Sequence, residues 1–124
     1  MGLQILFWLY LINTVLLILH ERNSAYWKEW ELFRLPGGIT GFLLLHFPLY
    51  IVSLYGLVLV YNAQLAGFIL SLVIAAAGIF AFCIHTYFLR LGREEFDTAI
   101  SKLILAALLG ISILQIGITI YLLI

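Results

Sequence analysis

Three histidines lie within segments of the chain that are otherwise almost wholly apolar. His20 closes the first such segment, His46 lies about two turns into the second, and His85 lies about one turn before the end of the third. An imidazole in an apolar environment needs a partner or a purpose, because burying an unsatisfied polar group is costly. Imidazole is also a common ligand of zinc and iron, so the three residues are candidate ligands of one metal ion.

Carboxylates near these histidines could complete a site for zinc or non-haem iron, which take nitrogen and oxygen ligands. Glu21 is the leading candidate, although it points about 100° away from His20 on an ideal helix. It would therefore reach the ion from a frayed helix end or orient another ligand. The residues expected to support the ligands are Asn13, Tyr50 and Asp97. By contrast, Glu29 and Glu31 are interpreted as solvated charges.

Three alternatives to a metal site stay open. His20 and Glu21 could be interfacial while His46 and His85 form hydrogen bonds inside a helical bundle. His46 and His85 could instead hold a haem, or the histidines could serve proton transfer or ion passage. No GxSxG, SxxK or Walker-type glycine motif is present, so nucleophilic catalysis has little support. The pattern favours a metal-binding protein that acts on a lipid or another apolar substrate. The alternative is a non-catalytic membrane interaction protein.

The composition excludes a soluble fold. Of the 124 residues, 65% are hydrophobic and 10% are charged, and the mean hydropathy is +1.19. Six basic and six acidic residues cannot cover the surface of a soluble domain of this length, so the lipid bilayer is the expected partner. The formal net charge of zero provides no basic field for phosphates, so nucleic acid is not an expected partner.

Four apolar runs are each long enough to cross a bilayer as a helix, which takes about 20 residues. The runs are continuous rather than alternating, which indicates helices rather than barrel strands. The predicted fold is all-α, a four-span transmembrane helical bundle that forms a single integral membrane domain over residues 1–124. The spans are expected at about 3–20, 39–61, 65–89 and 99–124.

The connection between the first two predicted spans differs in kind from the others. Tyr26, Trp30 and Phe33 recur at helical spacing, while the charged residues between them occupy other azimuths. This pattern predicts a short amphipathic helix over about 24–34 that lies in the membrane interface. Asn23 and Ser24 are the expected N-cap residues of that helix.

Basic residues occur in or beside only two of the three connections. They are Arg22, Lys28 and Arg34 in the first and Arg90, Arg93 and Lys102 in or next to the third. With four spans these two connections lie on the same side of the membrane, and the positive-inside rule assigns that side to the cytoplasm. Both termini are therefore expected to be extracytoplasmic.

Small residues form two stripes at which helices could approach closely in lipid. The stripe on the third predicted span is Gly67, Ser71, Ala75 and Gly78, and that on the fourth is Ala106, Gly110 and Gly117. Such faces favour contacts within the bundle, with a second copy of the chain, or with another membrane protein.

The region from His20 to Pro48 carries a dense pattern of residues. It contains His20-Glu21, then AYWKEWELF at 25–33, LPGGI at 35–39, and His46. This pattern resembles a family of small bacterial four-span proteins of unknown function, and the likeness implies a multi-pass protein of the bacterial inner membrane. A looser likeness is to the HXXEE domain, which pairs an intramembrane histidine with acidic residues. In this chain the double-acidic motif is absent, because Arg22 follows Glu21.

Overall fold

The computed structural model describes residues 1–92 and 98–124, and within these ranges it contains helices and no strand. The helices are α1 (Gly2–Tyr26), α2 (Glu29–Leu32), α3 (Gly38–Tyr61), α4 (Leu65–Arg90) and α5 (Ala99–Leu123). The four long helices are each long and apolar enough to cross a membrane. The predicted all-α four-span bundle is confirmed.

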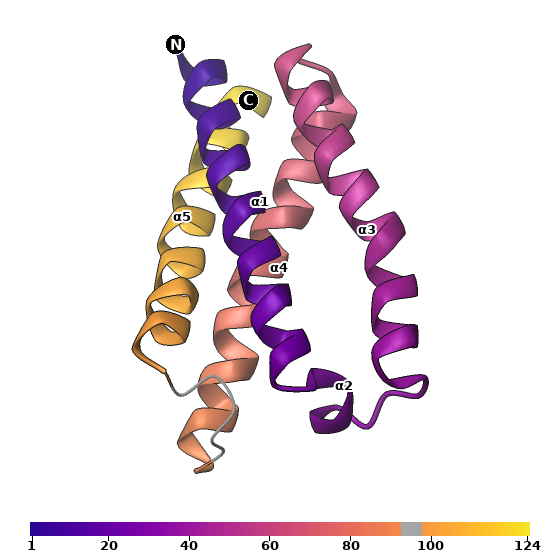
Figure 1. Ribbon diagram of the computed structural model, residues 1–124. Coiled ribbons are helices and arrows are strands. Elements are labelled where there is room, and N and C mark those ends of the chain that lie inside the picture. The colour runs from indigo at the N-terminus through magenta and orange to yellow at the C-terminus, as the bar shows by residue number, and fades with distance from the viewer. Residues whose placement is uncertain (93–97) are drawn as a thin grey trace.

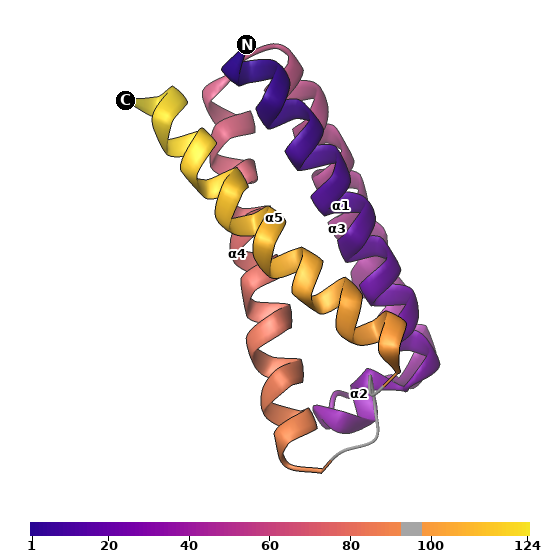
Figure 2. The same cartoon turned by 90° about the vertical axis from the view of Figure 1, so that its left-hand side faces the viewer.

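The long helices alternate in direction, so both chain termini lie at the same end of the bundle (Figure 1). The tight turn between α3 and α4 lies at that end as well, whereas α2 lies at the opposite end. Figure 2 shows α5 crossing in front of the space between α1 and α4. The most extensive contacts join α5 to α4 and to α1, and α3 packs mainly against α4.

The segment after the first span differs from the prediction. Helix α1 continues to Tyr26, so Asn23 and Ser24 are not N-cap residues but belong to its last turns. Lys28 adopts the left-handed conformation, with φ of 54°. This residue separates α1 from the four-residue helix α2, of which it is the N-cap. Tyr26 and Trp30 therefore do not share one continuous helix, and Tyr26 is exposed.

The centre of the bundle is polar rather than wholly apolar. Asn13 donates hydrogen bonds to Ser112 and to Gln115 of α5. Gln115 in turn donates to the carbonyl and to the hydroxyl of Ser71 on α4, and Ser71 is hydrogen-bonded to Thr119. All five side chains are buried. Polar faces directed at a common axis are what the absence of water in hydrocarbon requires.

Glycines set the closest helix approaches. A Cβ atom at Gly67 would lie 2.5 Å from the backbone nitrogen of Val60, so α3 and α4 touch through backbone here. A Cβ atom at Gly78 would collide with the hydroxyl of Ser112. The first predicted small-residue stripe is thus a packing face, because Gly67, Ser71, Ala75 and Gly78 are all buried.

The second predicted stripe is not a contact within the bundle. Ala106, Gly110 and Gly117 are exposed on α5. Among the described residues, no atom of a neighbouring helix lies within 4 Å of a Cβ built at Gly110 or Gly117. The buried face of α5 is instead formed by its polar residues and by Leu105 and Leu108.

Candidate metal centre

Two of the three histidines meet at the end of the bundle that carries α2. His20 lies on the last turns of α1 and His85 on the last turns of α4, and both are almost completely buried, with exposed fractions of 2% and 1%. The two ring centroids are 4.6 Å apart, with the ring planes inclined at 66°. The two histidines lie at the same depth in the bundle, as the sequence predicts, and their rings are in contact.

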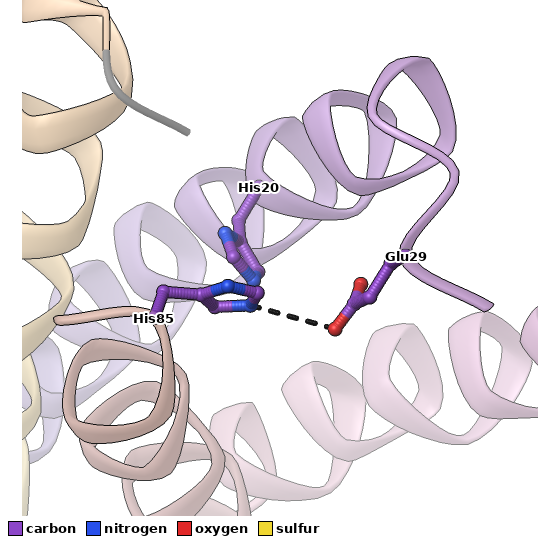
Figure 3. Close-up of side chains that lie close together, drawn as sticks. All are labelled: His20, Glu29 and His85. Atoms are coloured by element: carbon purple, nitrogen blue, oxygen red, sulfur yellow. Dashed lines mark ion pairs between the residues drawn. The ribbon is translucent and has the colours of Figure 1, made fainter. Parts of the chain in front are cut away.

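The carboxylate beside this histidine pair is Glu29, which the sequence pattern does not indicate as a ligand. Oε1 of Glu29 lies 3.4 Å from Nε2 of His85, and Figure 3 shows the carboxylate facing the edge of that ring. One ligand atom from each of His20, Glu29 and His85 lies within 4.8 Å of the other two. The exposed fraction of the Glu29 side chain is 15%, so the interpretation of Glu29 as a solvated charge is wrong.

The left-handed turn at Lys28 explains how Glu29 reaches the histidines. Because α1 ends at Tyr26, the turn folds the first residue of α2 back against the end of the bundle. Glu29 is then close to Ser24 as well as to the two imidazoles. Burial raises the pKa of the Glu29 carboxyl, but hydrogen bonds from His85 and Ser24 and the proximity of both histidines hold the pKa below its ordinary value. An ionised carboxylate is the form that binds a cation.

His46 has a different partner. Its Nε2 atom lies 2.6 Å from Oε2 of Glu21, and its Nδ1 atom lies 2.7 Å from the carbonyl oxygen of Phe42. The carbonyl can only accept, so Nδ1 is the donor in that contact, and Nε2 is left to face the carboxylate of Glu21.

The structure thus divides the predicted ligands between two neighbouring clusters. His20 and His85 meet with Glu29, whereas Glu21 meets His46. Of the predicted supporting residues, Tyr50 lies beside His46, with 5.8 Å between ring centroids. Asn13 belongs to the polar network in the middle of the bundle, and Asp97 lies outside the described residues.

A cavity that we call the aromatic chamber joins the two clusters. Its volume is about 340 Å³, and Glu21, Glu29 and His46 all line it. The remaining wall is largely apolar and includes the aromatic rings of Trp30, Phe33 and Phe42. Phe42 stacks on His46 at 4.0 Å, and Phe33 lies 6.1 Å from His85, so aromatic side chains hold both imidazoles in place. A polar cluster at an apolar chamber is the usual form of a small-molecule site.

The fold and the site define a small four-span membrane protein with a buried histidine and carboxylate cluster at one end of the bundle. The chain belongs to a family of unknown function (DUF6713), whose family model matches residues 6–122. This match confirms the resemblance to a family of unknown function, and it does not show the looser likeness to the HXXEE domain. Comparison with the curated proteins and with the solved structures gives no match.

Proposed function

We propose that the protein binds a divalent metal ion, zinc or non-haem iron, through His20, His85 and Glu29. The observation that carries this proposal is the convergence of two buried imidazoles and one carboxylate within 4.8 Å. Neighbouring ligands of a tetrahedral zinc ion are about 3.3 Å apart, given bonds of about 2.0–2.1 Å. The 3.4 Å between Glu29 and His85 already matches that spacing, and a modest contraction would bring the third ligand to it.

Three protein ligands leave a coordination position open, which is the pattern of catalytic rather than structural zinc. Glu29 lines the aromatic chamber. The open coordination position of the metal ion would therefore face this chamber. A metal ion there would polarise a carbonyl oxygen or lower the pKa of a bound water molecule. The Glu21–His46 pair lines the same chamber and would serve to accept or return a proton. We propose a lipid or another apolar molecule as the substrate, because the wall is mostly apolar.

Elemental analysis of the protein, expressed without a histidine tag and purified in detergent, tests the proposal. We expect about one zinc or iron atom per chain, and loss of the metal in His20→Asn and His85→Asn. Glu31→Gln is the matched control, because Glu31 belongs to α2 but is exposed. Wild-type protein that contains no metal and takes up neither zinc nor ferrous iron would overturn the proposal.

The second candidate function is a non-catalytic membrane interaction protein. It is favoured by the exposed face of α5, where Ala106, Gly110 and Gly117 would let another helix approach closely. Metal content separates the two candidates, because an assembly role needs no metal ion. A metal-free and stable bundle would favour the interaction protein.

A further inference from the structure

A second cavity lies beyond the Glu21–His46 pair, toward the middle of the bundle. It is a groove of about 180 Å³ between α1, α3 and α4. Glu21 and His46 line both this groove and the aromatic chamber, so the two spaces meet at the pair. Most of the groove wall is aliphatic, with Leu17 and Ile18 on one side and Ile74 on another.

The side of the groove opens toward the surrounding lipid. Leu49 and Val73 line it and have exposed fractions of 48% and 55%. Ala77, which also lines the groove, is exposed on α4. A molecule dissolved in the bilayer would therefore enter sideways between α3 and α4, with no need to cross water.

The inner wall of the groove carries an unsatisfied hydroxyl group. Thr14 is 3% exposed, and no hydrogen-bond partner for its Oγ1 atom is found among the residues that the structure describes. Thr14 and Glu21 are two turns apart on one face of α1, a separation of about 10 Å. One turn before Thr14 on α1, the hydroxyl of Tyr10 donates to the carbonyl of Ser53, which lines the groove on α3. A buried hydroxyl without a described partner in the wall of an apolar groove points to an oxygen atom on an occupant.

The charges around the groove select an uncharged occupant. No Lys or Arg is among the described residues that line the groove, so an anionic head group would find no counter-ion in that lining. Among the described lining residues, the carboxylate of Glu21 and the imidazole of His46 already have each other as partners, at 2.6 Å. A cationic head group would have to displace His46 from Glu21. An uncharged hydroxyl or carbonyl group meets none of these costs.

We propose that this groove binds an uncharged amphiphile, a hydrocarbon chain with a hydroxyl or carbonyl group, head inward. The oxygen of the head group accepts a hydrogen bond from Thr14, and the chain passes between Leu49 and Val73 into the lipid. Binding of this occupant is separate from the proposed metal centre, because the described residues that line the groove do not include His20, Glu29 or His85.

Photolabelling of the purified full-length protein in nanodiscs tests the groove. The probes are diazirine-bearing analogues of hexadecanol, palmitic acid, hexadecylamine and hexadecane, and labelled peptides are located by mass spectrometry. We expect the alcohol to label α1, α3 and α4 around the groove more strongly than the other three probes. Equal labelling by the acid or the amine would overturn the uncharged class, and equal labelling by hexadecane would overturn the role of Thr14.

Two variants separate the groove from general lipid contact. Ala77→Leu fills the open side and should abolish the specific labelling, whereas Ala76→Leu, at an exposed neighbour outside the groove lining, should not. Thr14→Val keeps the shape of the side chain and should weaken competition by unlabelled hexadecanol by about threefold to tenfold. Labelling of Ala77→Leu at the wild-type level, in protein of unchanged helicity and monodispersity, would overturn the groove.

The same experiment in the presence of a chelator distinguishes the two proposals. Labelling that persists in metal-free protein supports the groove whatever the metal content proves to be. Zinc uptake by Ala77→Leu at the wild-type level supports the metal centre whether or not the groove binds a ligand. Loss of labelling in wild-type protein on chelation would overturn the independence of the groove from the metal cluster.

Discussion

Oε2 of Glu21 lies 2.6 Å from Nε2 of His46, whereas the preceding residue, His20, faces His85 on another helix. Adjacent residues of one helix point in different directions, so α1 serves two clusters at once. His20 directs its ring between α1 and α4, and Glu21 directs its carboxylate toward α3. This division makes Glu29 rather than Glu21 the carboxylate of the proposed metal centre.

The first prediction compares these two carboxylates. Glu29→Gln should weaken zinc binding by more than about 100-fold, because it removes a charged ligand, whereas Glu21→Gln should weaken it by about tenfold or less. Competition against a chromophoric chelator in detergent measures both affinities. Glu31→Gln should retain the wild-type affinity. A larger loss in Glu21→Gln than in Glu29→Gln would instead assign the ligand role to Glu21, as the sequence predicts.

The sequence could predict the histidines of this site but not its carboxylate. Helical depth follows from counting residues within an apolar run, so the positions of His20 and His85 in their runs are enough to place both at one end of the bundle. Glu29 lies beyond the end of α1 and reaches the cluster only because Lys28 adopts a left-handed conformation. A non-glycine residue seldom takes that conformation, and nothing in the pattern around Lys28 indicates it.

The second prediction concerns the polar network in the middle of the bundle. Gln115→Leu removes the donor to Ser71 and one of the two acceptors of Asn13, so Asn13 keeps only Ser112 and the hydroxyl of Ser71 keeps only Thr119. The free energy of unfolding should fall by about 1–2 kcal/mol. Titration with dodecyl sulfate in mixed micelles, followed by circular dichroism, measures the change. Leu114→Ala, at an exposed position of the same helix, is the control and should change stability by less than about 0.5 kcal/mol.

A double variant shows whether Asn13 and Gln115 act together. If they do, Asn13→Leu should cost less in the Gln115→Leu background than in the wild type, because Gln115, one of the two partners of Asn13, is already absent. Strictly additive losses would mean that the hydrogen bond between the two side chains contributes nothing measurable.

The third prediction separates the two stripes of small residues. Gly67→Ala should lower the free energy of unfolding by about 1–3 kcal/mol, because the added methyl group meets the backbone of α3 at Val60. Gly110→Ala should cause no loss, since no described atom of a neighbouring helix lies within 4 Å of the added methyl group, and the better helix propensity of alanine should add about 0.5–1 kcal/mol. The same mixed-micelle titration measures both variants. A loss in Gly110→Ala that depends on protein concentration would instead reveal a contact between copies of the chain.

The two stripes also show where sequence reasoning stops. Both have the small-residue spacing that close helix packing uses, and the pattern alone cannot choose between a neighbour in the same bundle and one outside it. The polar residues of α5 determine which face of this helix is buried. Ser112, Gln115 and Thr119 must be buried away from hydrocarbon, and this requirement turns Gly110 and Gly117 to the outside.

The last prediction is the orientation of the bundle in the membrane. The termini and the turn between α3 and α4 share one end (Figure 1), and the described basic residues lie in or near the connections at the other end. Positive residues near span ends resist translocation, so the end with α2 should face the cytoplasm. Alkaline phosphatase fused after Ile124 should therefore be active and a fluorescent protein fused there should be dark. Fusions after Gly92, just beyond the end of α4, are the matched control and should give the opposite pair of results. Fluorescence from the fusion at Ile124 would reverse the orientation and place the proposed metal centre on the outer side of the membrane.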